Sequence, residues 1–305
     1  MRILVVGAGA TGGYFGGRLI QAGRDVTFLV RPGRADLLRR DGLRIISPHG
    51  DLTLAPKLLT ADQITQPFDA ILLSVKAYAL EPALADLAAA VGPATMIMPM
   101  LNGMRHIDRL IECFGEGPVL GGVCIVATTL DEEGRIRQLN DMQELIYGER
   151  SGAESARVAA LDAEMQGAGF KARSSTRILS EMWEKWVLLA TLGGVTCLMR
   201  GTVGEIEAAP GGASFALNCL NESIAIATAS GFPPREVFVE RAKSLVSTPG
   251  SNFASSMYRD MQQSAPIEAD HILGDFLDRA GRLAVPAPLL TIAYTHLSIY
   301  QNRLG

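Results

Sequence analysis

The chain has 305 residues, which is more than one simple hydrophobic core usually organises and is typical of two domains. Hydrophobic residues make up 48% and charged residues 20%, so the composition is that of an ordinary soluble globular protein. A net charge of −4 argues against nucleic acid or an anionic membrane surface as a partner. No CxxC pair occurs, so we expect neither a metal site nor a redox pair, and instead four reduced, buried cytosolic thiols at Cys113, Cys124, Cys197 and Cys219.

The N-terminus begins with residues 2–6, RILVV, a short apolar run typical of a buried parallel strand. A signal peptide is the alternative, but the run is short and dissolves into glycines. The glycines form a GxGxxG pattern between this strand and a predicted helix that ends near Ala22, which is the context of a dinucleotide-binding turn. Such a turn brings a pyrophosphate to the N–H groups of the helix. The motif residues are Gly7, Ala8, Gly9, Ala10, Thr11 and Gly12.

The end of the second predicted strand, residues 25–30, indicates which dinucleotide binds. In NAD-binding folds an acid about 20 residues beyond the glycines holds the ribose 2′-hydroxyl. Here the strand runs into Arg31, Arg34 follows, and no acid stands at the strand end. A guanidinium can hold a 2′-phosphate through two hydrogen bonds. We therefore expect NADP rather than NAD, with Arg31 on the 2′-phosphate; the alternative is that both arginines are solvated loop charges.

The following elements continue to alternate between strand and helix, which predicts a parallel sheet. One buried strand is expected to end in a polar turn at Lys76, and another to stop at Asn102. The expected elements are, in order, a short helix in ADLLRRDG, a hairpin over 43–54 that turns at Pro48-His49-Gly50, a strand over 69–78, a helix over 81–91, a strand within 94–104, and further strands in VLGGVCIVATTL and near ELIYG.

From Ser180 onward helical periodicity dominates, with breaks at proline and glycine clusters. We place a domain boundary near residue 175, in the polar run KARSSTR. The sequence thus predicts an α/β fold, with a Rossmann-type NADP-binding domain over 1–175 and an all-α substrate and catalytic domain over 176–305. The uncharged stretch 186–199 is shorter than the ~18 apolar residues of a membrane span, so we expect a buried helix there.

Lys185 stands at the head of that apolar stretch, between two tryptophans. An unpaired buried ammonium group is costly or loses its proton, so Lys185 is a snorkelling surface residue, one half of an i,i+4 pair with Glu181, or a working acid. Reduction of a carbonyl requires a proton donor as the hydride arrives. None of the four histidines stands in a distinctive setting. Lys185 is therefore the candidate acid for hydride transfer, with the other two interpretations open.

Several motifs, in the same order and at similar spacing, resemble those of the ketopantoate reductase family: GAGATG, SVKAY, LNGM, EMWEKW, and SSMYRD followed by IEAD. The resemblance covers nearly the whole chain. It implies a Rossmann domain joined to an α-helical domain. It also implies an oxidoreductase that reduces 2-dehydropantoate to pantoate with NADPH, in the cytoplasmic route to pantothenate and coenzyme A.

The resemblance assigns roles position by position. Lys185 matches the family's lysine acid, and Glu268 matches its acidic partner. Ser256 and Asn102 match residues that bind substrate, Asn102 also beside the nicotinamide, and Lys76 matches the lysine near the cofactor. Other interpretations stay open: Glu268 would also favour a helix N-terminus, Ser256 would suit a helix surface, and Asn102 would suit a turn.

The sequence departs from the family at three positions where relatives carry asparagine, and in the family the first two face the substrate side of their helix. Leu189 and Gly193 stand where relatives commonly carry asparagine, and Leu273 stands where an asparagine precedes a glycine. Loss of hydrogen-bonding side chains weakens binding of a polar hydroxylated acid. The alternative function is therefore NADPH-dependent reduction of a bulkier or aromatic 2-oxo acid on the same scaffold, and a remote alternative is a non-catalytic NADP-binding sensor. A homodimer stays open.

Overall fold

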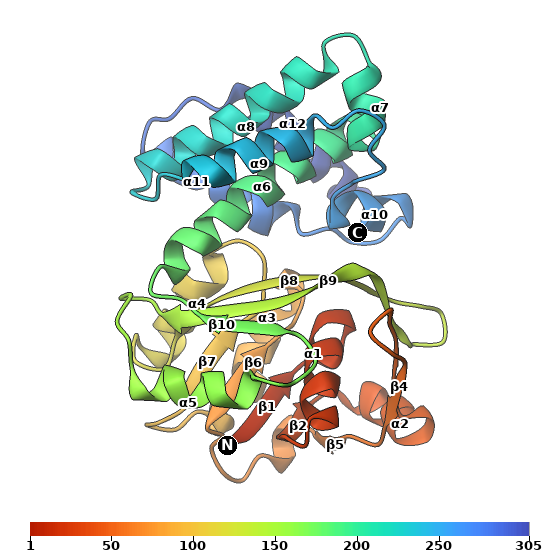
Figure 1. The fold of residues 1–305 in the computed structure, drawn as a ribbon, viewed down its shortest axis with the longest axis vertical. Helices are drawn as coiled ribbons and strands as arrows, with labels where there is room; N and C mark the ends of the chain where they lie inside the picture. The colour runs from red at the N-terminus through yellow and green to blue at the C-terminus, as the bar shows by residue number, and fades with distance from the viewer. Residues whose placement is uncertain (305) are drawn as a thin grey trace. The chain divides into compact units, whose positions relative to one another are not determined.

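The computed structural model describes residues 1–304, which form two compact units (Figure 1). The first unit comprises Met1–Leu101 and His106–Ile178. The second comprises the chain from Leu179 onward together with the short segment Asn102–Arg105. This segment therefore packs with residues that lie far along the sequence. Within residues 1–304, no helix is both long enough and apolar enough to span a bilayer.

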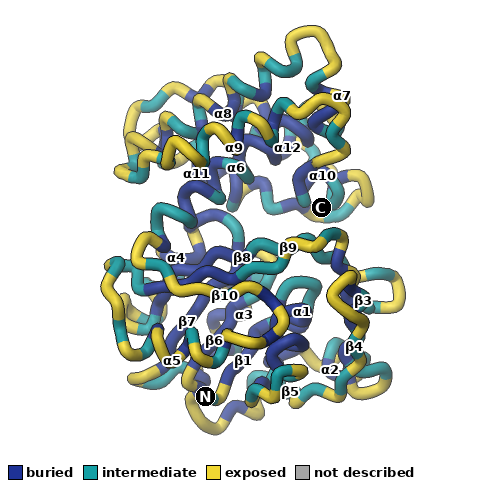
Figure 2. The backbone as a smooth tube through the Cα atoms, in the orientation of Figure 1, coloured by how far each residue is buried: buried dark blue, intermediate teal, exposed yellow. Residues whose placement is uncertain are grey.

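A five-stranded parallel sheet lies at the centre of the first unit, with strand order β5-β2-β1-β6-β7. Its inner strands are buried along nearly their whole length, because both faces of such a sheet are covered (Figure 2). The predicted parallel sheet is confirmed. Its strands are β1 (Arg2–Val6), β2 (Asp25–Leu29), β5 (Lys57–Leu59), β6 (Ala70–Leu73) and β7 (Met96–Pro99).

A second sheet in the same unit has the order β10-β9-β3-β4, with β8 paired antiparallel to β9. The hairpin predicted over residues 43–54 is confirmed, since β3 and β4 pair antiparallel. Residues 171–174, which the sequence suggests are part of a polar boundary, instead form an edge strand parallel to β9, because alternate polar side chains suit an exposed edge. The strands are β3 (Leu43–Ile46), β4 (Leu52–Leu54), β8 (Leu120–Leu130), β9 (Ile136–Glu149) and β10 (Lys171–Ser174).

The helices of the first unit connect these strands. The core between them is apolar and includes the edge-to-face pair of Phe15 and Phe170, whose ring centroids are 4.9 Å apart. The helices are α1 (Ala10–Gln21), α2 (Pro32–Asp41), α3 (Leu80–Leu87), α4 (Arg105–Phe114) and α5 (Ala156–Met165), with short 3₁₀ turns η1 (Ala61–Gln63), η2 (Ala77–Ala79) and η3 (Ala88–Ala90).

The second unit is helical, as predicted. Its longest helix contains the uncharged stretch 186–199, which is mostly buried. The expectation of four buried thiols is wrong for Cys113, which is exposed near the end of α4, whereas the other three are buried. None of the four cysteines, all within the described residues, forms a disulfide. The elements are α6 (Ile178–Met199), α7 (Val203–Ala208), α8 (Gly212–Ala229), α9 (Glu236–Val246), α10 (Ser256–Gln262), the π-helical turn η4 (Asp270–Gly274), α11 (Asp275–Arg282) and α12 (Pro288–Asn302).

Candidate active site

Two glycines of the GxGxxG turn occupy positions that no other residue type fits. Gly7 has a φ of +93°, and a β-carbon there would lie 2.9 Å from the carbonyl oxygen of Ser74. A β-carbon on Gly12 would lie 2.3 Å from the carbonyl oxygen of Gly7. The first glycine therefore permits the left-handed turn, and the third permits close packing of β1 against α1.

The second glycine leaves an open surface at the start of α1. A β-carbon on Gly9 would meet no atom within 4 Å. Gly9 is the N-cap of α1 and supplies no side-chain hydrogen bond to the first turn, so N–H groups of that turn can face an anion. This combination of tight turn, open backbone and helix N-terminus fits the pyrophosphate of a dinucleotide.

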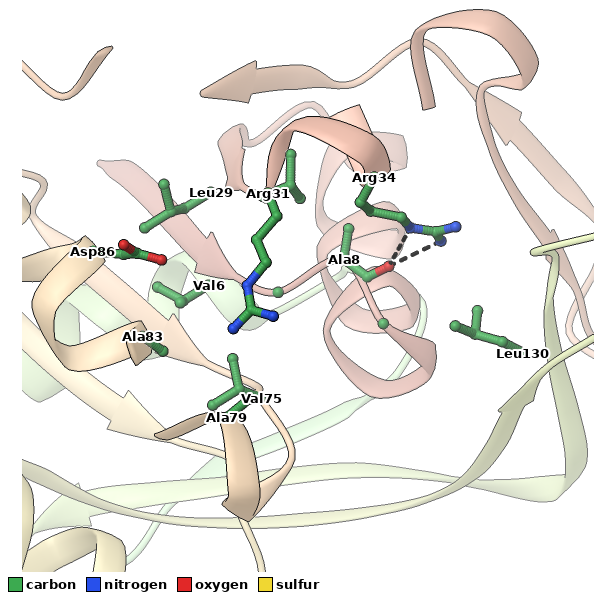
Figure 3. Close-up of a pocket in the computed structure, with 13 residues that line it drawn as sticks. Val6, Ala8, Leu29, Arg31, Arg34, Val75, Ala79, Ala83, Asp86 and Leu130 are labelled. Carbon is green, nitrogen blue, oxygen red and sulfur yellow. Dashed lines mark hydrogen bonds between the residues drawn. The ribbon is translucent and has the colours of Figure 1, made fainter. Parts of the chain in front are cut away.

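A cavity of about 270 Å³ adjoins the glycine turn (Figure 3). The Arg31 side chain extends into it toward Val75 and Ala79. Arg34 turns the other way, and its Nε and Nη2 donate hydrogen bonds of 3.1 and 3.0 Å to the carbonyl oxygen of Ala8. Burial lowers the pKa of Arg34, although a guanidinium stays charged at any physiological pH. The lining residues are Val6, Gly7, Ala8, Gly9, Leu29, Val30, Arg31, Arg34, Val75, Ala79, Ala83, Asp86 and Leu130.

Sequence reasoning missed the far wall of this cavity. Ala79, Ala83 and Asp86 line it from η2 and α3, and Leu130 lines it from the end of β8. The first three are spaced i, i+4, i+7 and so share one face of a helix. That spacing could have predicted them as cavity residues once the preceding strand, β6, was placed beside β1. Lys76, predicted near the cofactor, is exposed and caps η2 directly after Val75; Lys76 itself lies outside the residues that line this cavity.

In the second unit, Lys185 is half-buried on α6 beside two buried neighbours. Glu184 is 5% exposed and accepts three hydrogen bonds from Arg235: 3.0 Å from the backbone N, 2.8 Å from Nε and 2.5 Å from Nη2. The side-chain hydrogen bonding to Glu184 raises the pKa of Arg235. The buried carboxylate adjacent to Lys185 in sequence therefore has a guanidinium partner of its own.

Three segments that are distant in the sequence meet at Trp186, the residue after Lys185. The Nε1 of Trp186 donates a 2.9 Å hydrogen bond to the carbonyl oxygen of Ile272. Gly103 has a φ of +78°, and a β-carbon there would lie 2.7 Å from the carbonyl oxygen of His271 and 3.7 Å from Trp186 Nε1. Asn102 and Lys185 are therefore each one residue from this meeting point.

Glu268 belongs to the same region. It is half-buried just before the helical turn that begins at Ala269, and its carbonyl oxygen accepts a 3.0 Å hydrogen bond from the N–H of Ile272. The structure thus gathers the segments of three predicted site residues, Asn102, Lys185 and Glu268, within one unit. His271 lies in the same turn, and burial holds its pKa below the usual value.

Ser256 lies on α10, whose N-cap contacts α6. It is the half-buried first residue of α10, whose N-cap Ser255 forms a 2.8 Å hydroxyl–hydroxyl hydrogen bond with Thr196. The Cε of the next residue, Met257, lies 2.3 Å from where a β-carbon on Gly193 would stand. Gly193 follows Lys185 by eight residues, or about 12 Å along a helix. Ser256 therefore lies beside α6 about two turns beyond Lys185.

Comparison with known proteins covers both units. Residues 3–152 match the family described as "Ketopantoate reductase PanE/ApbA", and residues 177–301 match "Ketopantoate reductase PanE/ApbA C terminal". The chain is 34% identical over 301 residues to the Bacillus subtilis protein named uncharacterized oxidoreductase YkpB, covering 99% of both chains. It is 29% identical to a 2-dehydropantoate 2-reductase of Mesorhizobium japonicum, covering 96% of this chain and 94% of that one.

A solved structure supports the same assignment. The 2-dehydropantoate 2-reductase of Geobacter metallireducens superposes with a TM-score of 0.88 at 27% identity, covering 98% of this chain and 99% of the other. The two family matches together span most of the sequence, including the glycine turn, Lys185 and Glu268. The chain belongs to the ketopantoate reductase PanE/ApbA family and is an oxidoreductase of the 2-dehydropantoate 2-reductase type.

Proposed function

We propose that this protein reduces 2-dehydropantoate to pantoate with NADPH, in the cytoplasmic synthesis of pantothenate and coenzyme A. Residues 1–175 bind the cofactor and supply Asn102, and residues 176–305 supply the acid and the other substrate contacts. The observation that carries the proposal is the meeting of Gly103, Trp186 and the turn after Glu268 beside Lys185. It supports a common role for Asn102, Lys185 and Glu268.

The chemistry follows from the residue types. A bound reduced nicotinamide would supply the hydride. The open backbone at Gly9 and the N-terminus of α1 would hold the pyrophosphate. Lys185 donates the proton to the carbonyl oxygen of the substrate as its carbon is reduced. Glu268 orients the substrate and favours the charged form of Lys185, and Asn102 and Ser256 bind the polar groups of the substrate.

The preference for NADPH rests on charge in the cavity beside the glycine turn. Arg31 reaches into that cavity and carries a group suited to a 2′-phosphate. Lys76, next to the lining residue Val75, would add a further cation near the cofactor. Asp86 is the opposing group, since its carboxylate lines the same cavity. Two arginines against one aspartate leave the lining with a net positive charge, which favours the more negative cofactor.

A second candidate function is reduction of a bulkier or more apolar 2-oxo acid. The methyl group of Met257 takes the space beside Gly193, next to Ser256, and the half-buried Leu189 lies one turn nearer to Lys185. These two side chains offer apolar surface and no hydrogen bonds. A site of that kind discriminates poorly in favour of a hydroxylated substrate.

The test is NADPH oxidation by the purified protein with ketopantoate, 2-oxoisovalerate, phenylglyoxylate and phenylpyruvate. A strong preference for ketopantoate supports the first function, and preference for an aromatic or branched acid supports the second. No turnover with any of them refutes both and leaves the non-catalytic sensor.

Lys185→Ala tests the mechanism. We expect turnover to fall by about 10² to 10⁴, the usual contribution of general acid catalysis, with NADPH affinity unchanged. Lys243→Ala is the matched control, because 45% of that lysine side chain is exposed and it pairs with Glu240 on the same helix. Near-normal turnover by Lys185→Ala would remove Lys185 from this role.

A further inference from the structure

The hydrogen bond of Trp186 ends in an unusual piece of backbone. Its acceptor, Ile272, lies in the π-helical turn Asp270–Gly274. Trp186 and Ile272 are each only 1% exposed. In a π turn the i→i+5 pattern displaces carbonyls from their usual partners, and such turns occur frequently at functional sites. The indole N–H satisfies a buried acceptor, and losing such a partner costs more than an average hydrogen bond contributes.

The opposite side of the turn has a support of its own. The hydroxyl of Tyr294 on α12 donates a 2.9 Å hydrogen bond to Asp270. A β-carbon on Gly274 would lie 2.8 Å from the same hydroxyl, so α12 approaches the turn closely. The turn is therefore held between α12 and α6, and Trp186 is the contact on the side of Lys185.

Aromatic and charged contacts fix the orientation of the indole. Its ring lies 4.6 Å from that of Phe276, edge to face, and 5.0 Å from that of Trp183. The guanidinium of Arg279 lies 5.4 Å from the Trp186 ring centroid and 3.4 Å from the carboxylate of Asp275. Rings and guanidinium together leave the indole little freedom to turn its N–H away from Ile272.

The same indole touches the third segment of the candidate site. A β-carbon on Gly103 would lie between the carbonyl oxygen of His271 and Trp186 Nε1, at 2.7 and 3.7 Å. A displaced turn would therefore also displace the backbone next to Asn102.

We propose that Trp186 is a positioning residue, whose N–H sets the register of the Glu268 turn and the Asn102–Gly103 segment against the helix that carries Lys185. This inference rests on the proposed function, in which those three residues act on one substrate. Reacting groups lose much of their effect when displaced by about 1 Å, so loss of this one hydrogen bond lowers kcat rather than cofactor affinity.

The test compares Trp186→Phe with the matched control Trp183→Phe. Both changes replace an indole by a phenyl ring in the same cluster, and Trp183 also contacts Phe276, at 6.1 Å. We expect Trp186→Phe to lower kcat about 10-fold or more and to shift the pH profile of kcat, with the Kd for NADPH within about twofold of wild type. Trp183→Phe should leave kcat within about threefold of wild type and should not shift its pH profile, even if it lowers the melting temperature.

Amide hydrogen exchange of residues 268–276 gives a readout independent of turnover. Exchange there should become about 10-fold faster in Trp186→Phe and not in Trp183→Phe, because only the first loses the bond to the turn. Equal exchange in both variants overturns the proposal even if wild type proves inactive on every 2-oxo acid. Faster exchange with unchanged kcat, in an active protein, overturns the positioning role.

If Trp186→Phe does not fold, benzothienylalanine at position 186 replaces it. This analogue keeps the bicyclic shape and has sulfur in place of the N–H. The same drop in kcat and rise in exchange are expected, and wild-type values for both would reject the proposal.

Discussion

The guanidinium of Arg34 donates two hydrogen bonds, of 3.1 and 3.0 Å, to the carbonyl oxygen of Ala8 inside the glycine turn. Its Nη2 also lies 3.5 Å from the carbonyl oxygen of Gly134, in the loop between β8 and β9. Arg34 thus ties the glycine turn to α2 and to that loop. Arg31 instead extends into the cavity. The two arginines, three positions apart, therefore differ in their contacts: Arg34 binds the backbone of the glycine turn, and Arg31 faces the cavity.

Arg31→Met and Arg34→Met should separate cofactor choice from turn geometry. We expect Arg31→Met to raise the Kd for NADPH about 10- to 100-fold, the equivalent of one charged hydrogen-bonded contact, and to leave the Kd for NADH nearly unchanged. Arg34→Met should raise both Kd values together, because the pyrophosphate is common to the two cofactors. Titration by nucleotide fluorescence measures all four constants. An equal loss of both cofactors in Arg31→Met would contradict the assignment of the 2′-phosphate.

Replacement of Gly9 by alanine should affect cofactor affinity, whereas replacement of Gly12 by alanine should affect stability. Gly9→Ala adds a methyl group in open space, so stability should stay within about 0.5 kcal/mol while the Kd for NADPH rises about 10-fold or more, since the methyl blocks close approach of the pyrophosphate. Gly12→Ala drives a β-carbon to 2.3 Å from a backbone oxygen and should lower the free energy of unfolding by about 1 to 3 kcal/mol. Urea unfolding and nucleotide titration report the two effects. Gly117→Ala, another open position, should change neither; unchanged affinity in Gly9→Ala would refute the prediction.

The pair of Glu184 and Arg235 should be asymmetric toward mutation. Glu184 has a 6% exposed side chain, whereas 42% of the Arg235 side chain is exposed. Arg235→Met strands a buried carboxylate and should lower the free energy of unfolding by about 2 to 3 kcal/mol. Glu184→Gln leaves a hydrated guanidinium and should cost about 1 kcal/mol. Urea denaturation of both variants checks the order, and a larger loss in Glu184→Gln would be inconsistent with the burial of that carboxylate.

His271 should make the protein less stable in acid. Burial, with a smaller contribution from Arg105, lowers the pKa of His271 below its usual 6.5, against the raising effect of Glu268, Asp270 and Asp275. Below about pH 6.5 this histidine binds a proton more readily in the unfolded state than in the folded state, so protonation favours unfolding. The free energy of unfolding therefore decreases as the pH falls through this range, and the effect is absent at higher pH, where the histidine is neutral in both states.

His271→Gln should therefore lose less stability than wild type between about pH 7.5 and 5.5. Unfolding free energies from urea titrations at both pH values give the comparison. Parallel losses in wild type and variant would mean that other groups carry the acid sensitivity.

Much of the fold could be predicted because its signals are local. Apolar runs such as residues 2–6, the glycines at 7, 9 and 12, and the helical period after Ser180 depend on residues close together in the sequence. The hairpin over 43–54 was predictable for the same reason. The strand at 171–174 was not, because its polar residues become a strand only through pairing with β9.

The candidate site shows the same division. Lys185 stands out in the sequence because a charge at the head of an apolar helix needs an explanation, and the motifs single out Asn102, Ser256 and Glu268; their roles stay predictions. Asp86 could be placed beside the glycine turn only once the strand before its helix was set next to β1, since α3 lines the same cavity as the ends of β1 and β2.

By itself, the sequence determined the parallel sheet, the glycine turn between its first strand and first helix, and the lysine on a buried helix, because each depends on the conformational preferences of neighbouring residues. Only the tertiary structure decided that Gly103 approaches His271 and that Trp186 bonds to Ile272. It also decided that Met257 fills the space beside Gly193, and that Arg34 binds Ala8 while Arg31 faces the cavity. These contacts join residues far apart in the chain. Long-range contacts depend on how whole elements pack, and packing selects one arrangement from many that the local sequence allows equally well.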